Sequence, residues 1–599
     1  MNASQLRARA LLIDGRFSRL LSSSHVRKCT FQSRRALHNV PHLQQAQSDR
    51  FRPYYVTSPI FYVNAEPHAG HLYTLLLTDV LKRWEVLKGD NQASLLTGTD
   101  EHGMKVQKAA ESAATATKQF CDKHATQFLD LARAANISFD RFIRTTDPDH
   151  KVAVEHFWKQ LKERGYIYQS THEGWYSVSD ETFYPESQVH LVLEPSTGRK
   201  IYASKETGKE VEWTSETNYH FRLSAFRDRL LEHYDQHPQF IVPSMRMNFI
   251  KKEVEAGLSD LSVSRPSSRL QWGIRVPDDD TQTIYVWLDA LINYLTATGY
   301  PYGEGGNHKL WPPNVQVIGK DIVRFHCIYW PAFLMALDIP LPRAFLTHAH
   351  WTMGKAKMSK SLGNGVNPFL AIERFGLDAI RYFMIHDGGI VDDADYDNMF
   401  IVEKYKKGLQ DGLGNLLTRI LRGRKWSIRT SLEQVMNNGS LKKPDSARIQ
   451  DMIEMINSTA RSADEAMQSV NPRSALHNIM KLVYETNKFF QEMAPWNLVK
   501  DGHPDSRESL HMTIYTSAEA ARVACILLQP FMPNKMQQAL DHLHVLPDKR
   551  SFQMAEVGCD ETYGSGASEA AHEKIPENMK KRIRYAHDGV LFPPLLTEV

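Results

Sequence analysis

The chain has 599 residues, of which 42% are hydrophobic and 24% are charged, and its formal net charge at pH 7 is +3. That length predicts two to four domains, and the mean hydropathy of -0.43 is typical of a water-soluble globular protein. Because no apolar run approaches the roughly 18 residues of a membrane-spanning helix, we expect no association with a membrane. The five cysteines, none in a CxxC pair, argue against an oxidising compartment.

Residues 1–48 differ in composition from the rest of the chain. They hold seven arginines and Lys28 against the single acid Asp14, a net charge of +7 that leaves −4 on the remainder. An arginine-rich, serine-rich and acid-poor start predicts a mitochondrial transit peptide and a location in the mitochondrial matrix. The alternative is a disordered arm that binds nucleic acid. A secretory signal is disfavoured because no continuous apolar segment follows the basic start.

A predicted strand over 54–59 leads to the segment His68-Ala69-Gly70-His71 and then to a predicted helix. Apolar residues recur downstream at helical spacing, from Leu72 to Leu87. A helix that starts after a strand offers backbone N–H groups and a favourable dipole to an anion, and two imidazoles add donors for phosphate. Two surface histidines at a helix start are the alternative.

Further on, glycines flank the sequence KMSKS at 357–361 on both sides, and this composition predicts a mobile loop. Lys355, Lys357 and Lys360 place three ammonium groups within six residues. Such a loop can close on a triphosphate and follow its charge as pyrophosphate leaves. Alone, it is also compatible with a solvated basic loop. The occurrence of Lys360 in the same chain, 292 positions after His68, favours a shared nucleotide site.

Together the two segments resemble the HIGH and KMSKS signatures of class I aminoacyl-tRNA synthetases, with Ala69 in place of isoleucine. The resemblance implies an α/β protein with a Rossmann-type parallel-sheet catalytic domain, a connective insertion and an α-helical anticodon-binding bundle. It also implies activation of an amino acid by ATP with Mg²⁺, followed by transfer to tRNA. The catalytic residues it implies are His68, His71, Lys357 and Lys360, and the ATP-binding residues are His68, Gly70, His71, Gly319, Asp321 and Lys360.

Residues between the two motifs are similar to the methionyl family of this class. The interval is too short for the editing insertion of the isoleucine, valine and leucine enzymes, and the cysteinyl enzyme's cysteine-ligated zinc has no counterpart here. Trp287, Ala290 and Tyr294 lie on one helix face, where an aromatic slot would suit a thioether, although such a stripe can equally be core. The resemblance implies a methionine site at Ile60 (by its carbonyl), Tyr62, Asp100, Trp287, Ala290, Tyr294, Phe325, His326 and Trp330.

Many methionyl enzymes carry a zinc knuckle in the insertion, but the matching region, 172–221, contains no cysteine. Ser177 and Asp180 stand where a CxxC pair would fall, and the histidines at 172, 190 and 220 are widely separated. We therefore expect a knuckle-shaped insertion without protein-bound zinc.

After about residue 395, helical periodicity over 399–423, 449–468, 473–493 and 510–530 predicts a helical bundle. Asn471-Pro472 is a typical helix start. The resemblance implies anticodon recognition by Asn415, Arg419 and Trp496, of which Trp496 could stack on an unpaired base. A tryptophan after a proline can otherwise be a packing plug.

The resemblance covers roughly 51–550 and implies a methionine–tRNA ligase that acts on mitochondrial tRNA(Met), L-methionine and ATP; we expect a monomer. Two rivals are another nucleotidyl transferase of the same fold and a non-enzymatic RNA-binding relative. The expected regions are a transit peptide (1–48), the first catalytic half (49–165), the connective insertion (166–265), the second catalytic half (266–340), a stem-contact segment with the KMSKS loop (341–395), the helical domain (396–550) and a tail (551–599).

Overall fold

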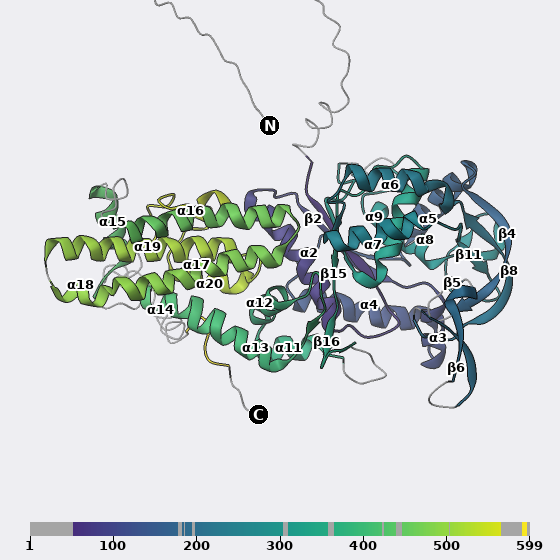
Figure 1. Cartoon of the computed structure of the whole chain (residues 1–599), viewed down its shortest axis with the longest axis horizontal. Coiled ribbons are helices and arrows are strands. Elements are labelled where there is room, and N and C mark those ends of the chain that lie inside the picture. Colours follow the sequence, from purple (N-terminus) through teal and green to yellow (C-terminus); the bar gives the residue numbers. More distant parts are fainter. Residues whose placement is uncertain are drawn as a thin grey trace, which may run out of the picture. The chain divides into compact units, whose positions relative to one another are not determined.

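The structure is a computed structural model (Figure 1). It describes residues 52–177, 182–184, 186–193, 198–205, 207–302, 309–357, 365–421, 425–438, 446–501, 503–564 and 590–595. The predicted transit peptide, Asp180 and Lys360 therefore lie outside the described residues. Pro53–Val599 is a compact unit by itself. Among the described residues, no helix has both the length and the hydropathy needed to cross a bilayer.

A six-stranded parallel sheet forms the centre of the catalytic part. Its spatial order is β3 (Arg141–Arg144), β2 (Ser94–Asp100), β1 (Tyr55–Tyr62), β14 (Val315–Gly319), β15 (Phe345–His348) and β9 (Ile241–Val242). The chain runs outward from β1 to one side and returns to the other side at β14. Ligands bind at such a switch point, beyond the carboxyl ends of the strands, so the sheet places a site after Tyr62 and Gly319.

Smaller antiparallel sheets are inserted between β3 and β14. One contains β4 (Ile167–Ser177), β5 (Thr182–Tyr184), β8 (Glu212–Phe221) and β10 (Leu261–Ser262), and a separate hairpin pairs β6 (Val189–Leu193) with β7 (Lys200–Ser204). A third contains β11 (Ser264–Pro266), β12 (Arg275–Val276) and β13 (Asp279–Ile284). Strand β9, which falls inside 166–265, instead pairs with β15 at the edge of the main sheet. The predicted α/β fold with a connective insertion is confirmed.

Helices connect these strands and cover the main sheet. They are α2 (Ala69–Lys88), α3 (Met104–Ser112), α4 (Thr117–Ala134), α5 (Pro148–Glu163), α6 (Arg227–Gln236), α7 (Ser244–Glu255), α8 (Val286–Leu291), α9 (Asn293–Thr296) and α10 (Trp330–Ala336). A π-helical turn, Phe325–Tyr329, directly precedes α10. Two further helices, α11 (Pro368–Phe375) and α12 (Leu377–Asp387), follow the KMSKS region.

Residues 351–357, which lead into the predicted KMSKS loop, form a hairpin. The remainder of that predicted loop, from residue 358 to 364, lies outside the described residues. Strands β16 (Trp351–Met353) and β17 (Ala356–Lys357) pair antiparallel, and β18 (Ala394–Asp395) pairs with β16 on the other side. Gly354 and Lys355 both have positive φ, at 58° and 62°. Consecutive residues with positive φ are what a tight two-residue hairpin turn requires, so the glycine next to the lysine closes a turn here.

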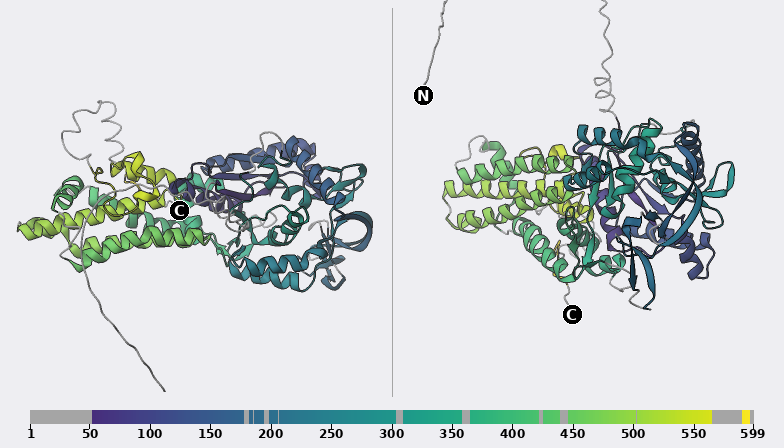
Figure 2. Two further views of the ribbon diagram at one scale, coloured as in Figure 1. Left: turned by 90° about the horizontal axis from the view of Figure 1, so that it is seen from above. Right: turned by 45° about the vertical axis from the view of Figure 1, so that its right-hand side comes forward.

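The second part of the chain is the predicted helical bundle, which is confirmed. Its elements are α13 (Asn398–Lys404), a π-helical segment (Tyr405–Gly414), α14 (Asn415–Leu421), α15 (Ile428–Asn438), α16 (Ala447–Gln468), α17 (Pro472–Met493), α18 (Pro495–Asp501), α19 (Pro504–Leu528) and α20 (Pro533–His542). Helices α16, α17 and α19 run side by side (Figures 1 and 2). Asn471 caps α17 by accepting from Ser474 N, and Pro472 is its first residue, as predicted.

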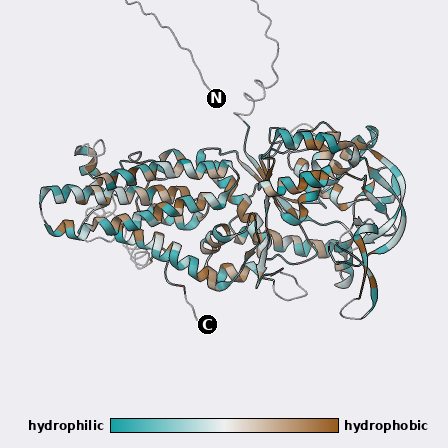
Figure 3. Ribbon diagram, in the orientation of Figure 1, coloured by the Kyte–Doolittle hydropathy of each residue, from teal (hydrophilic) through white to brown (hydrophobic). Residues whose placement is uncertain are grey.

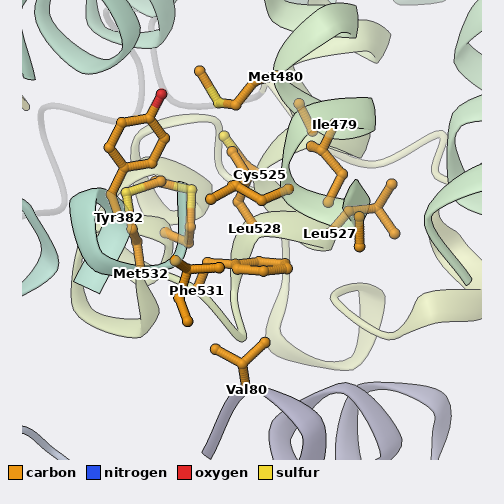
Figure 4. Close-up of a cluster of buried hydrophobic side chains, with 14 of the residues drawn as sticks. Val80, Tyr382, Ile479, Met480, Cys525, Leu527, Leu528, Phe531 and Met532 are labelled. Carbon is orange, nitrogen blue, oxygen red and sulfur yellow. The ribbon is translucent and has the colours of Figure 1, made fainter. Parts of the chain in front are cut away.

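Helix α2 is buried on nearly all sides because it belongs to both parts of the chain. Its predicted face, including Leu72 and Val80, is buried, and so are Leu75 and Leu77 on other faces. One continuous hydrophobic core contains α2 together with α12, α17 and α19. In Figure 4, Val80 faces the cluster that Phe531 and its neighbours form. The bundle helices carry both hydrophobic and hydrophilic residues (Figure 3), as amphipathic packing requires.

Candidate active site

A cavity of about 400 Å³ opens at the carboxyl ends of β1 and β14, where the sheet topology places a site. It brings together residues from segments that are up to 292 positions apart in the chain, from Pro59 to Trp351. The predicted site residues that line it are Ile60, Tyr62, His68, Gly70, His71, Asp100, Trp287, Ala290, Tyr294, Gly319, Asp321 and His326.

The two histidines of the first motif cap helix α2. His68 is the N-cap residue, and its Nδ1 accepts from Gly70 N at 3.1 Å, while Nδ1 of His71 accepts from His68 N at 3.1 Å. The two rings stack with centroids 3.8 Å apart. Because each Nδ1 is an acceptor, the proton of each neutral ring is on Nε2. Both imidazoles are thus oriented to donate to an anion at a helix N-terminus.

Two glycines allow close approach at this end of the sheet. A Cβ atom at Gly70 would lie 2.9 Å from Cε1 of His68, and one at Gly319 would lie 2.6 Å from Oδ1 of Asp321. Real Cβ atoms do not approach so closely, so either side chain would displace a predicted site residue. Glycine at both positions keeps His68 and Asp321 in place.

Aromatic rings form a slot in the wall of the cavity. Trp287 and Phe325 stack with centroids 3.7 Å apart and an interplanar angle of 8°. Nδ1 of His326 donates to the carbonyl of Ile322 at 3.0 Å, so its Nε2 accepts from the hydroxyl of Tyr294 at 2.8 Å. Burial lowers the pKa of His326 to about 4, which keeps the ring neutral at physiological pH. The slot is therefore uncharged on this side and suits an apolar, polarizable side chain.

Two predicted pocket residues lie one layer behind this wall. Phe325 supports Trp287 by stacking, and Trp330 packs against Tyr294 with centroids 6.1 Å apart while donating to Gln316. The π-helical turn over 325–329 contains an extra residue per turn, which changes the direction in which the following side chains point.

Sequence reasoning missed several residues that line the cavity. His348 is the last residue of β15, beside Gly319 at the end of β14, and His350 follows two residues later. Nε2 of His348 lies 2.8 Å from Oγ1 of Thr74 on α2, and Nε2 of His350 lies 3.2 Å from Oδ1 of Asp321. The signal in the sequence was a His-x-His pattern at the end of an apolar strand. This pattern indicates a site residue only once β15 is known to lie beside β14.

The cationic segment is only partly described. Lys355 is exposed, and its backbone N–H donates to Oδ1 of Asp395 at 3.0 Å. Lys357 ends strand β17, and the KMSKS residues from 358 onward, including Lys360, lie outside the described residues. The hairpin nevertheless starts from Trp351, which itself lines the cavity.

The three predicted anticodon residues are close together in the bundle. Asn415 and Arg419 lie on α14, and Trp496 lies on α18. The guanidinium carbon of Arg419 lies 5.6 Å from the ring centre of Trp496 and 4.8 Å from that of Phe490. Asn415 is exposed, and Trp496 is half-buried. A stacked arginine and tryptophan beside an exposed amide can contact an unpaired base.

The histidines at 190 and 220, in the region that matches the zinc knuckle, differ in their environment. His190 is exposed on β6, and His220 is buried on β8 with Nδ1 3.1 Å from the carbonyl of Asn218. Within the described ranges, no group of three or more histidine, cysteine, aspartate or glutamate side chains could hold a metal ion.

Comparison with known families agrees with this geometry. Residues 54–421 match the model described as "tRNA synthetases class I (M)", and residues 440–583 match "Anticodon binding domain of methionyl tRNA ligase". A parallel sheet with a histidine-capped helix at its switch point and an adjacent helical bundle thus defines a class I aminoacyl-tRNA synthetase.

Curated relatives and solved structures narrow the assignment further. "Probable methionine--tRNA ligase, mitochondrial" of Neurospora crassa is 51% identical over 92% of this chain and 86% of its own length. "Methionine--tRNA ligase, mitochondrial" of Saccharomyces cerevisiae is 38% identical over 88% of this chain and 96% of its own. Mycobacterium tuberculosis methionyl-tRNA synthetase in complex with methionyl-adenylate has a TM-score of 0.78 and 38% identity, over 86% and 98% of the two chains. The chain belongs to the methionyl-tRNA synthetase family and is a methionine–tRNA ligase.

Proposed function

We propose that the protein activates L-methionine with MgATP and transfers the methionyl group to the 3′ end of mitochondrial tRNA(Met). One observation carries this proposal: the capped histidines of α2 and the aromatic slot of α8 line the same cavity. That cavity can hold a phosphate chain and a thioether side chain side by side. The hairpin of β16 and β17, which leads into the KMSKS sequence, starts from the wall of the same cavity.

In the first step, the methionine carboxylate attacks the α-phosphate of ATP and pyrophosphate leaves. His68 and His71 donate to the phosphates, while Lys357 and Lys360 stabilise the charge that develops on the leaving group. Gly319 and Asp321 would contact the ATP ribose or the substrate amino group, and Asp100 would take the methionine ammonium group. Ile60 and Tyr62, at the end of β1, complete the amino-acid site together with the aromatic slot.

In the second step, a terminal ribose hydroxyl of the tRNA attacks the activated carbonyl and AMP leaves. This step needs no nucleophile from the protein. Asn415, Arg419 and Trp496 would recognise the anticodon, because their side chains form a stacked, hydrogen-bonding surface in the bundle.

We place the enzyme in the mitochondrial matrix as a monomer without bound zinc, with 1–48 as its transit peptide. The composition of 1–48 supports this location, as do the names of the fungal relatives. We also propose that 49–340 is the catalytic domain, interrupted by the connective insertion at 166–265. Residues 341–395 would be the stem-contact segment and 396–550 the anticodon-binding domain.

The first test is ATP–pyrophosphate exchange by the chain without 1–48, with methionine, cysteine, leucine, isoleucine and valine offered separately. Exchange with methionine alone supports the proposal, and charging of mitochondrial tRNA(Met) then tests the second step. If the folded protein exchanges with none of the five, it is an RNA-binding relative or another nucleotidyl transferase.

A second test changes Lys360 to Ala. We expect exchange to fall by about a hundredfold or more, because the loop cation acts on charge that develops only in the transition state. Binding of tRNA should stay nearly unchanged. Normal turnover in this variant would remove the loop from the mechanism.

A further inference from the structure

A buried carboxylate lies behind the wall of the amino-acid pocket. Asp289 is 0% exposed and stands on α8 between Trp287 and Ala290, which both line the cavity. Its Oδ2 lies 2.6 Å from Nδ1 of His102, and its Oδ1 lies 2.8 Å from Nε2 of His150. An ionised carboxylate can be buried only when it is paired and hydrogen-bonded, and the two imidazoles meet both conditions.

The two imidazoles come from different parts of the chain. His102 stands two residues after Asp100, between β2 and α3. His150 is on α5, and its Nδ1 lies 3.1 Å from Oγ1 of Thr296 on α9. Burial raises the pKa of the Asp289 carboxyl, but the charge and hydrogen bonds of the imidazoles outweigh it and lower that pKa to about 2. A single carboxylate thus joins three segments of the catalytic domain.

Two of these segments carry residues of the predicted methionine site and form its two sides in this proposal. Asp100, at the end of β2, and Trp287 and Ala290, on α8, all line the cavity. A methionine held by both sides would place its ammonium group at Asp100 and its thioether in the aromatic slot. The distance between the sides then depends on the contact between His102 and Asp289.

We propose that Asp289 is a positioning residue for the amino-acid substrate. Through His102 it holds the segment that carries Asp100 at a fixed distance from the helix that carries Trp287 and Ala290. This inference rests on the proposed function, since it concerns how the same pocket binds methionine. A misplacement of about 1 Å between groups that hold a substrate is enough to reduce its productive binding.

The test is Asp289→Asn in the full-length protein. The side chain keeps its shape, but its amide N–H can only donate, so the imidazole that faces it must either change tautomer to accept or lose its hydrogen bond. In ATP–pyrophosphate exchange we expect the KM for methionine to rise about tenfold while the KM for MgATP changes by less than about twofold.

A second readout separates positioning from general loosening. The analogue 4-(methylthio)butanoate lacks the ammonium group and would contact the aromatic side alone. Its inhibition constant should change by less than about twofold in Asp289→Asn, because only a ligand that spans both sides senses their separation. Equal weakening of methionine and the analogue would overturn the proposal, and so would an unchanged KM for methionine.

Variants of His102 keep the test decisive if Asp289→Asn does not fold. His102→Asn places an amide N–H near the position of Nδ1–H, and it should keep a nearly normal KM for methionine. His102→Leu removes the donor and should raise that KM as Asp289→Asn does. Equal values for the two His102 variants would overturn the proposal. Absence of exchange in the unmodified protein would instead contradict the proposed function.

Discussion

The guanidinium of Arg381 donates to the carboxylate of Asp79 at 2.6 Å, and both side chains are completely buried. Asp79 lies on α2, whose first turn carries His68 and His71 at the cavity, and Arg381 lies on α12. Arg381 also donates to the carbonyls of Ala135, Pro530 and Phe531. This ion pair therefore joins the catalytic helix to the segment between α19 and α20.

The first prediction concerns the stability of this connection. Asp79→Asn removes the carboxylate that is hydrogen-bonded to the buried guanidinium of Arg381, so we expect it to lower the free energy of unfolding by about 3–5 kcal/mol. Urea denaturation followed by fluorescence would measure the shift. Glu403→Gln, which removes the partner of Lys407 from an exposed ion pair, should leave the curve unchanged. An Asp79→Asn curve that coincides with that of Glu403→Gln would contradict the prediction.

A second prediction concerns Gly70. In Gly70→Ala, the new methyl group would meet His68 at 2.9 Å and displace its imidazole. We expect ATP–pyrophosphate exchange to fall by about tenfold or more, with a raised KM for ATP and an unchanged KM for methionine. Alanine favours helix more than glycine does, so the melting temperature should not fall. A normal KM for ATP would mean that His68 does not contact the phosphates.

A third prediction concerns the dependence of stability on pH. Burial lowers the pKa values of His326 and His348 to about 4, whereas the unfolded chain binds these protons near pH 6.5. Acidification therefore favours the unfolded state, and each ring should remove about 1.4 kcal/mol of stability per pH unit between roughly pH 6.5 and 4.

Denaturation of the wild type and of His348→Gln at pH 7, 6 and 5 would measure this effect. Glutamine does not titrate, so the slope of stability against pH should become shallower by the contribution of one histidine. Equal slopes for the two proteins would show that folding does not lower the pKa of His348.

The fourth prediction separates tRNA recognition from activation. Arg419→Ala removes the cation that lies over Trp496, and we expect the KM for tRNA in aminoacylation to rise by about tenfold or more. Methionine-dependent exchange without tRNA should remain unchanged. Arg448→Ala, at a half-buried arginine of α16 that pairs with Glu492, is the matched control and should leave both assays unaffected. A similar rise in both variants would indicate a nonspecific charge effect.

Much of the fold could be predicted from local patterns in the sequence. Asn471 and Pro472 start α17 because an amide side chain caps a free N–H group and proline tolerates the first helical position. The spacing of Leu72 and Val80 predicted helix α2 and one buried face. It could not predict that Leu75 and Leu77 are buried as well, because that depends on a bundle folded from residues more than 300 positions later.

The candidate site shows the same division. Local patterns in the sequence predicted the motifs, their order, the helix that His68 and His71 cap, and the helical placement of Trp287, Ala290 and Tyr294, because these features depend on residues a few positions apart. The structure divides the last of these predicted helices between α8 and α9. Only the tertiary structure decided that Trp330 lies behind Tyr294, that His348 contacts α2, and that Asp289 meets His102 and His150. The physical reason is that a buried charged or polar group is stable only when it has a partner. The order of strands in the parallel sheet decides which residue can be that partner, and it brings together residues that are far apart in the chain.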